Sequence, residues 1–378
     1  MSAVMSPARH RAPAMPNAGV ACNPEPRLAL LGSGTVGQAF VARYQGLRDA
    51  GIALPPLRLL ANSRGMRDGG DDPSRALASV AELPQREQGV IPDLDALSGG
   101  DVVVDATASD DVAAQHCQWL GRGLHVVTAN KLGGGGALPR ARAIAAAAHA
   151  TGACYGDSAT VGAGLPLLRS IRELVAGGDR IHVIEGVLSG SLAWLFDRFD
   201  GMRPFSGFVR EARAAGYTEP DPRIDLGGED VRRKLLLLAR AAGAPLEWER
   251  VSVESLLPRS LAEAGASEID ARLPLLDAPL RGRYQQAHRD GAGLRFMGRF
   301  EVDAHGAWHA SVGLRALPRS HPLCGGSGTD NRVAIHSCRY REQPLVIQGP
   351  GAGADVTAAA LLDDVLRIAR TTWHPAWP

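Results

Sequence analysis

The stretch Arg27-Leu-Ala-Leu-Leu-Gly-Ser-Gly-Thr-Val-Gly37 decides how the first part of the chain folds. An apolar run stops at Gly32 and helical spacing follows, which predicts a buried strand that turns directly into a helix. The glycines form a G-x-G-x-x-G pattern, which in this context permits a tight turn, close approach of a pyrophosphate and close helix packing. The first N–H groups of the helix then face the phosphates. A glycine-rich turn without a ligand is the alternative interpretation. We expect a nucleotide to contact Gly32, Gly34, Thr35, Val36 and Gly37.

Strand-like and helix-like segments alternate through the first 150 residues. Further strands are predicted at 57–62, 101–107 and 125–131, and helices at 36–47, 112–120 and 139–151. This alternation predicts an α/β fold, namely a doubly wound parallel (Rossmann) sheet that binds ligands at the carboxyl ends of its strands.

After about residue 150 the pattern becomes mixed, which predicts a second α+β substrate and dimerisation domain. Helices are expected at 165–176 and 232–242, and strands at 180–188, 294–302, 308–314 and 332–336. A last helix at 356–369 is expected to return to the first domain. The predicted parts are a flexible N-terminal extension, a nucleotide-binding domain, a substrate-binding, catalytic and dimerisation domain, and a C-terminal helix: residues 1–26, 27–152, 153–347 and 348–378.

Composition excludes several classes of protein. Of the 378 residues 45% are hydrophobic and 21% are charged, which is typical of a globular protein that is neither disordered nor membrane-embedded. The formal net charge of +1 suggests neither a nucleic-acid nor a membrane partner. The five cysteines are scattered, without a C-x-x-C pair. This argues against a disulfide framework or a thiolate zinc site and favours a reducing, cytoplasmic location.

The end of the second strand bears on the choice of cofactor. An acidic residue there would bind the ribose 2′-hydroxyl of NAD, whereas an arginine would favour the 2′-phosphate of NADP. The sequence has Ala61-Asn-Ser-Arg64 and no acid, so Arg64 favours NADP, with NAD possible. Arg64 as a solvated loop residue is nearly as good an interpretation. Thr107, Asn130 and Lys131 follow later strands, where the nicotinamide and a substrate should meet.

Polar groups are dense in three later segments. The loop 161–166 offers carbonyl or N–H groups, and 189–192 ends a strand where backbone N–H groups suit a carboxylate. Asp230 and Lys234 are four residues apart on a predicted helix, and such a pair is usually a solvated ion pair. The apolar run that follows Lys234 favours a role at a buried edge instead. Glu219 and Asp225 lie in a proline-rich, stiff loop that suits a substrate ammonium group.

The signature segment 216–234, Gly-Tyr-Thr-Glu-Pro-Asp-Pro-Arg-Ile-Asp-Leu-Gly-Gly-Glu-Asp-Val-Arg-Arg-Lys, closely resembles that of homoserine dehydrogenases. Four other motifs, in the family's order, are similar too: Thr128–Lys131, Val161–Pro166, Gly186–Leu192 and Gly349–Gly353. The chain most resembles the dehydrogenase half of the bifunctional aspartokinase–homoserine dehydrogenases. The resemblance implies interconversion of L-homoserine and L-aspartate 4-semialdehyde with NAD(P), in threonine and methionine biosynthesis, by a homodimer formed through the second domain.

The resemblance also implies roles for particular residues. Glu219 would bind the substrate amino group, and the other substrate contacts would be Ser191, Tyr217 and Asp225. Asp230 and Lys234 would address the reacting oxygen, and Lys131 is the candidate acid/base. The nicotinamide would be bound by Thr107 and Asn130, with Gly353 and Lys131 among the cofactor contacts.

The sequence departs from the family pattern at three places. The family has an acidic residue at the position of Ser158, where it helps the carbonyls of the 161–166 loop bind a monovalent cation such as Na⁺. That site, formed by Val161, Ala163 and Leu165, is therefore in doubt here. Ile224 replaces the first aspartate of an Asp-Asp pair, which could weaken substrate contacts or only change packing. The glycine run 133–136 suggests a mobile loop beside the site.

Two other functions remain open at this point. The chain could be an oxidoreductase of another amino acid or semialdehyde, which Ile224 and Ser158 could reflect. It could also be a catalytically inactive nucleotide-sensing protein. A dead site has no physical need for Lys131, Glu219, Asp230 and Lys234 together, which argues against the second of these.

Overall fold

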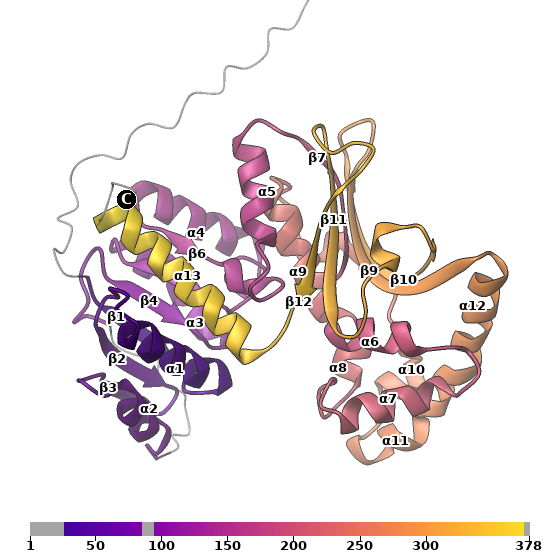
Figure 1. The fold of residues 1–378 in the computed structure, drawn as a ribbon, viewed down its shortest axis with the longest axis horizontal. Helices are drawn as coiled ribbons and strands as arrows, with labels where there is room; N and C mark the ends of the chain where they lie inside the picture. The colour runs from indigo at the N-terminus through magenta and orange to yellow at the C-terminus, as the bar shows by residue number, and fades with distance from the viewer. Residues whose placement is uncertain (1–25, 85–93, 374–378) are drawn as a thin grey trace, which may run out of the picture.

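Two six-stranded sheets, each packed against helices, make up the protein (Figure 1). The structure is a computed structural model that describes residues 26–84 and 94–373. The predicted flexible extension at 1–26 lies outside the described residues, apart from Pro26.

The first sheet has the strand order β3-β2-β1-β4-β5-β6. Its strands are β1 (Leu28–Leu31), β2 (Leu57–Asn62), β3 (Gly65–Asp68), β4 (Val102–Asp105), β5 (His125–Thr128) and β6 (Tyr155–Gly156). All pairings are parallel except that of β3 with β2. The order reverses between β1 and β4, and this is where a doubly wound sheet opens a crevice for its ligand. The predicted Rossmann sheet is confirmed, with an additional antiparallel edge strand.

Helices cover both faces of this sheet because alternate side chains of its strands point to opposite sides. Leu28 and Leu30 of β1 pack with Phe40 in one core, whereas Ala29 and Leu31 pack with Trp119 in another. The first face carries α1 (Thr35–Asp49), α2 (Pro73–Ala81) and α13 (Ala354–Trp373), and the second carries α3 (Asp110–Gly121) and α4 (Leu138–Thr151). The C-terminal helix α13 thus packs beside α1 on the first sheet (Figure 1).

The second sheet has the order β12-β11-β7-β9-β10-β8. Its strands are β7 (Ile181–Val187), β8 (Val251–Val253), β9 (Ala292–Val302), β10 (Trp308–Pro318), β11 (Asp330–Ser337) and β12 (Leu345–Pro350). Only the pairing of β8 with β10 is parallel. The strand β8 was not anticipated from the sequence, because three residues carry too little periodicity to predict a strand.

The helices of this second part are α5 (Leu167–Ala176), α6 (Gly190–Arg198), α7 (Phe205–Ala214), α8 (Arg223–Leu226), α9 (Glu229–Ala241), α10 (Arg259–Ala262), α11 (Ile269–Arg272) and α12 (Asp277–Arg289). Helix α9 crosses one face of the sheet, and its residues 234–239 are all buried. It therefore provides a rigid support for polar residues at its first turn.

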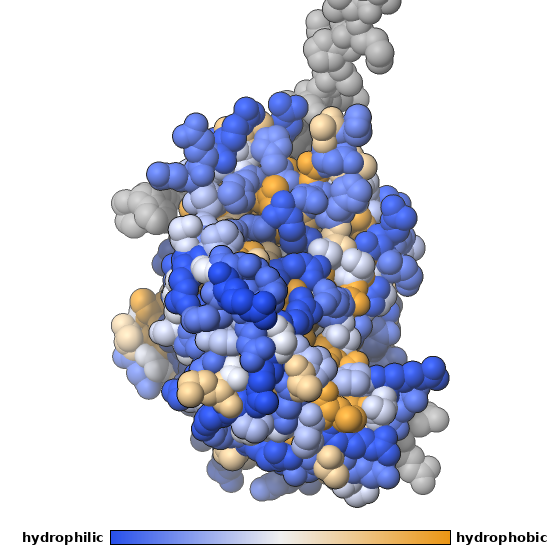
Figure 2. All heavy atoms as spheres, turned by 90° about the vertical axis from the view of Figure 1, so that its right-hand side faces the viewer, coloured by the Kyte–Doolittle hydropathy of each residue, from blue (hydrophilic) through white to orange (hydrophobic). Residues whose placement is uncertain are grey.

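The surface of the protein carries no single extended apolar patch on the side at the right of Figure 1. That side is mostly hydrophilic, and its hydrophobic residues lie in small groups (Figure 2). Within residues 26–84 and 94–373, no helix combines the length and the apolar character needed to cross a membrane.

Two glycines of α1 allow a direct test of the nucleotide turn. A Cβ atom at Gly37 would overlap the carbonyl oxygen of Gly32, whereas one at Gly46 would enter open space. We expect Gly37→Ala to lower the free energy of unfolding by about 1–3 kcal/mol through backbone displacement. Gly46→Ala, the matched control, should raise it by about 0.5–1 kcal/mol because alanine favours helix. Urea denaturation measures both, and equal effects would contradict this account of the turn.

Candidate active site

Three charged side chains from two parts of the chain meet at one point. The Asp230 carboxylate lies 3.3 Å from Nζ of Lys131 and 2.7 Å from Nζ of Lys234. Lys131 follows β5 of the first sheet, and the other two residues belong to the first two turns of α9. The structure therefore joins the end of a Rossmann strand to the second part of the chain through one carboxylate.

The two lysines differ in how firmly they are held. Only 10% of the Lys234 side chain is exposed, and its ammonium group also donates to the carbonyl oxygen of Leu188 at 2.7 Å. Lys131 is 36% exposed and contacts Asp230 at the longer distance. Lys234 is thus a fixed charge, whereas Lys131 has donors available for another group.

The charge of Asp230 is set by its neighbours. Burial by itself would raise the pKa of this carboxyl, but the positive charges of Lys234 and Lys131 outweigh burial and lower the pKa to about 2. Its side chain still has 43% of its surface open, because it faces a pocket. Asp230 is therefore an anion at neutral pH.

A pocket of about 270 Å³ opens at this point, at the carboxyl ends of β4 and β5. It brings together the predicted nicotinamide residues Thr107 and Asn130 with Lys131 and Asp230. The amide of Asn130 is held by the carbonyl of Ser109, at 2.8 Å, and reaches the Thr107 hydroxyl at 3.4 Å. The lining also includes five residues to which the sequence analysis assigned no role: Ala108, Ala129, Leu132, Glu229 and Arg233.

A second cluster of polar groups extends the candidate site to the end of β7. The Ser191 hydroxyl donates to Asp225 at 2.6 Å, and the backbone N–H of Glu219 donates to the other oxygen of Asp225 at 2.9 Å. Ser189 caps α6 and bonds to Ser191 at 2.8 Å. Because Ser189 follows Leu188, whose carbonyl binds Lys234, the two polar groups are continuous.

The remaining signature residues lie at the rim of this group. Tyr217 is half-exposed, with its ring centroid 5.4 Å from that of Trp194. The Glu219 side chain is exposed, and its carboxylate makes no hydrogen bond within the described part of the chain. Ile224 is 59% exposed and takes part in none of these polar contacts. Its substitution for aspartate therefore leaves the Ser191–Asp225 contact in place.

The glycine-rich turn has the shape of a nucleotide cradle. A Cβ atom at Gly34 would meet no atom within 4 Å, and one at Gly32 would press on the Ala106 carbonyl at 2.9 Å. Helix α1 has no side-chain cap, so its first N–H groups are free to face phosphates. The residues therefore fit a dinucleotide. Arg64 lies in the β2–β3 turn and donates to the carbonyl oxygens of Ala81 and Leu83 at 2.5 and 3.3 Å.

The loop 161–166 lies beside the start of α13. A Cβ atom at Gly164 would contact the Val356 carbonyl, three residues after Gly353, so the two glycine motifs are neighbours. Ala163 has a positive φ of 50°, which is strained for a residue other than glycine. No cluster of three His, Cys, Asp or Glu side chains able to hold a metal ion occurs among the residues that the structure describes.

The acidic side chains near this loop are already paired. The Ser158 N–H and hydroxyl both donate to Asp364 of α13, at 3.0 and 2.9 Å. The neighbouring Asp157 binds Arg172 through two hydrogen bonds of 2.5 and 2.7 Å. Asp157 therefore does not take over the part of the missing acid at position 158.

Two arginines of α9 hold the turn that follows Lys131. Arg233 donates to the carbonyl of Gly135 at 2.9 Å, and Arg240 donates to those of Gly134 and Gly136 at 2.6 and 2.8 Å. The glycine run is therefore clamped to α9, contrary to the mobile loop that its composition suggests. Glycine is required because Cβ atoms there would press on Leu237 or on the turn itself.

A simple count in the sequence would have identified the two lysines. The chain has 41 cationic Lys and Arg residues, and only two of them, Lys131 and Lys234, are lysines. A guanidinium cannot release its proton under physiological conditions, whereas an ammonium group can. Both groups with this property lie against Asp230.

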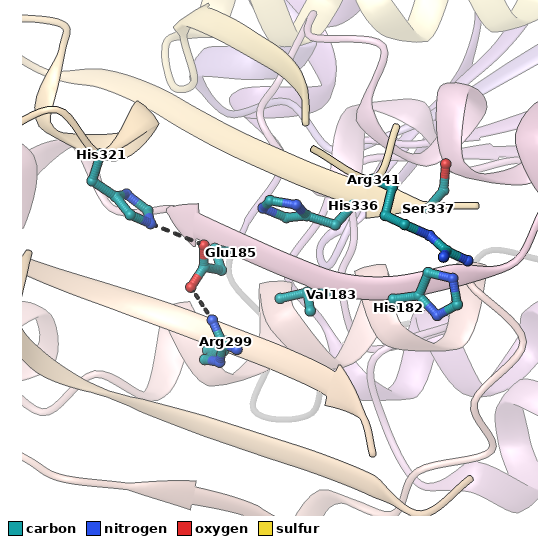
Figure 3. A pocket seen from close by; sticks show the side chains of 8 residues that line it. All are labelled: His182, Val183, Glu185, Arg299, His321, His336, Ser337 and Arg341. Carbon is teal, nitrogen blue, oxygen red and sulfur yellow. Dashed lines mark hydrogen bonds and ion pairs between the residues drawn. The ribbon is translucent and has the colours of Figure 1, made fainter. Parts of the chain in front are cut away.

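A larger pocket, of about 550 Å³, shares none of its lining with this site. It lies on the second sheet, where Glu185 is paired with Arg299 and, at 3.2 Å, with His321 (Figure 3). Its volume is greater, but Lys131 and Asp230 line the smaller pocket together with the predicted nicotinamide residues, and we take that pocket as the candidate active site.

The ion pairs of Asp230 predict a pH dependence of stability. Its pKa in the folded protein lies below the ordinary 3.8, so its charge stabilises the fold at neutral pH and this contribution is lost as the pH falls from about 4 towards 2. We expect the wild type to be more stable than Asp230→Asn in urea at pH 6, and the difference to shrink below pH 4. Glu263→Gln, in an exposed ion pair, is the control and should differ little from wild type. A constant difference would contradict the assignment.

Two family models match most of the chain. Residues 32–155 match the model described as the NAD binding domain of homoserine dehydrogenase, and residues 166–366 match the model described as homoserine dehydrogenase. The hyperthermophilic archaeal homoserine dehydrogenase in complex with NADPH has a similar fold, with a TM-score of 0.67 and 19% identity over 91% of this chain and 98% of that one.

Individual relatives agree with the models. The chain is 44% identical over 277 residues to a chloroplastic bifunctional aspartokinase/homoserine dehydrogenase of Zea mays; the match covers 73% of the chain but only 30% of the relative. The chain thus spans under a third of the length of that bifunctional protein. It is 34% identical over 365 residues to a homoserine dehydrogenase of Emericella nidulans, a match that covers 90% of the chain and 97% of the relative. The chain therefore belongs to the homoserine dehydrogenase family.

Proposed function

We propose that the protein interconverts L-homoserine and L-aspartate 4-semialdehyde with a nicotinamide cofactor, in threonine and methionine biosynthesis. The observation that carries the proposal is the Lys131–Asp230–Lys234 cluster, which connects the pocket at β4 and β5 to the polar groups at the end of β7. A bound reduced nicotinamide supplies the hydride, and the oxidised form accepts it. The residues of the chain must bind the substrate and move one proton.

Lys131 is the better acid/base of the two lysines. Its ammonium group has one carboxylate contact, at 3.3 Å, and partial exposure, so it can turn to the substrate oxygen and exchange protons with water. In the reductive direction it gives a proton to the aldehyde oxygen, and in the oxidative direction its neutral amine takes the hydroxyl proton. Lys234, held by Asp230 and Leu188, donates a hydrogen bond to the same oxygen.

The substrate carries an ammonium and a carboxylate group, and the polar groups at β7 can bind both. Glu219 offers an exposed carboxylate for the ammonium group, next to Asp225. The N–H groups at the start of α6, beside Ser191, suit the carboxylate. Tyr217 would close the rim over the substrate.

The finer choice of cofactor is NADP(H), with NAD(H) as the alternative. The absence of an acid at the end of β2 and the presence of Arg64 support NADP(H). Arg64 must exchange its contacts with Ala81 and Leu83 for the 2′-phosphate, which is possible because these carbonyls lie at the exposed end of α2. A monovalent cation such as Na⁺ at the carbonyls of Val161, Ala163 and Leu165 would bind without a carboxylate from position 157 or 158.

The activity and the roles of the lysines can be tested together. Purified protein with L-homoserine should reduce NADP⁺, and less readily NAD⁺, as followed by absorbance of the reduced cofactor. We expect Lys131→Ala to lower kcat by about 10²–10⁴-fold because the proton carrier is lost. Lys131→Arg should have a kcat nearly as low as that of Lys131→Ala, since a guanidinium keeps the charge but does not release its proton. Arg259→Ala, at an exposed ion pair, is the control and should keep wild-type activity.

Other results would favour the other functions. Turnover of a different amino alcohol, with L-homoserine inert, would indicate another substrate. Binding of NADPH without turnover of any substrate in a broad panel would indicate a nucleotide sensor. Full activity of Lys131→Arg would contradict the proton-carrier role while leaving the reaction in place.

The proposal includes a cytoplasmic homodimer formed through the second sheet. The face that bears the Glu185–Arg299 pair is the candidate interface, because α9 packs on the sheet's other face. A reducing compartment suits the free cysteines within the described residues, Cys117, Cys154, Cys324 and Cys338.

Val346 allows a test of this interface. It pairs with Ala334 of β11, two residues from His336, and therefore lies on the face that His336 lines. We expect Val346→Glu to shift the mass measured by light scattering from dimer to monomer, because it places a charge in the contact. Met202→Glu, at an 83% exposed position elsewhere, is the matched control and should remain a dimer. Dimers of both variants would exclude this face.

A further inference from the structure

A buried chain of polar side chains lies behind the nicotinamide pocket and has no part in the mechanism above. Asp105, the last residue of β4, and His116 of α3 are both completely buried, with Nε2 of His116 2.9 Å from Asp105. Nδ1 of His116 lies 3.1 Å from the hydroxyl of Tyr155 in β6. Three elements of the first sheet layer thus contribute one carboxylate, one imidazole and one phenol.

Asp105, at one end of this series of hydrogen-bonded side chains, lies next to the pocket. Asp105 accepts hydrogen bonds from the backbone N–H and the hydroxyl of Thr107, at 2.8 and 2.7 Å. Thr107 lines the pocket and is linked to Asn130. The carboxylate is therefore one side chain away from the space that we assign to the nicotinamide.

The other end of this series of side chains explains why the run after Lys131 begins with a glycine. A Cβ atom at Gly133 would collide with the Tyr155 hydroxyl and come within 2.9 Å of Nδ1 of His116. Glycine at this position lets the turn that begins at Lys131 pack directly on the imidazole–phenol pair. Through Asp105 and Gly133, these side chains therefore contact both the segment that follows β4 and the segment that follows β5.

The hydrogen-bond partners of the imidazole bear on where its protons lie. The Tyr155 hydroxyl is 3.1 Å from Nδ1 of His116, and either atom can be the donor of this hydrogen bond. When the phenol is the donor, Nδ1 carries no proton, and a neutral imidazole has its proton on Nε2, which donates to Asp105. Asp105 also accepts hydrogen bonds from the N–H and the hydroxyl of Thr107. In this arrangement, which the proposal below requires, the carboxylate leaves one net negative charge on the group.

We propose that Asp105, held by His116 and Tyr155, is a positioning residue whose buried negative charge favours binding of the oxidised, cationic nicotinamide over the reduced, neutral one. This inference rests on the proposed function, because it requires a nicotinamide in the pocket lined by Thr107 and Asn130. The charge acts through a protein interior in which Coulomb interactions are weakly screened. It also acts at equilibrium, so it is visible in binding without any turnover.

The measurement that tests the proposal is the ratio of two dissociation constants. NADPH is titrated by its fluorescence, and NADP⁺ by displacement of NADPH, with wild type and variants at the same pH and salt concentration. Asp105→Asn removes the charge and keeps an oxygen for Thr107. We expect it to weaken NADP⁺ about tenfold more than NADPH. Loss of positioning alone would weaken both cofactors by the same factor.

Two further variants separate charge from packing. Asp101→Asn removes a buried carboxylate that precedes the same strand, about 13 Å from Asp105, where Arg27 neutralises it at 2.6 Å. Its ratio should equal that of wild type. Tyr155→Phe removes the phenol oxygen but leaves the charge on Asp105, so both constants should rise together without a change of ratio. A changed ratio in Asp101→Asn would overturn the assignment to Asp105.

A measurement on the unaltered protein guards against an Asp105 variant that fails to fold. The ¹⁵N shifts of the His116 imidazole should show a neutral ring with its proton on Nε2, and a doubly protonated ring would overturn the proposal. An unchanged ratio in folded Asp105→Asn would also overturn it. If neither NADPH nor NADH binds the wild type, the proposed function itself has failed, which is a different result.

Discussion

The ammonium group of Lys234 belongs to a side chain of which nine-tenths is removed from solvent. A buried charge is tolerated only when it is paired and hydrogen-bonded, and here Asp230 and the Leu188 carbonyl do both. These two contacts fix the start of α9 relative to the end of β7. Since Ser189 follows Leu188 directly and Ser191 lies two residues further on, the requirement to compensate one charge also places the groups that we assign to the substrate.

The same carboxylate extends this constraint to the first sheet. Asp230 reaches Lys131, and the turn after Lys131 is clamped to α9 by Arg233 and Arg240. Helix α9 therefore holds both sides of the pocket: one through its own first turn, the other through the glycine run. A buried apolar helix is well suited to this task, because its residues 234–239 leave it little freedom to shift.

The features that could be predicted from the sequence are those whose cause is local. The apolar runs of β1, β2, β4 and β5 and the glycine-rich turn between β1 and α1 each carry their own periodicity, and the structure has them where they were expected. Strands β3 and β6 were not anticipated, because one is largely exposed and the other has two residues. Helices α7, α8, α10, α11 and α12 were also missed, since short helices interrupted by Pro and Gly leave a weak helical pattern, whereas α9 was predicted at 232–242.

The sequence predicted less of the candidate site than of the fold, because the contacts of the site are less local. An Asp–Lys pair four residues apart predicts only that Asp230 and Lys234 share a face, and a solvated pair was the more common outcome. What distinguishes this pair is a third charge, Lys131, that is about 100 residues away in sequence and reaches Asp230 only through the fold. The importance of the two lysines could still be inferred from the sequence alone. In a chain that otherwise uses arginine for every cation, the two positions that keep an exchangeable proton are those where a dehydrogenase must move one.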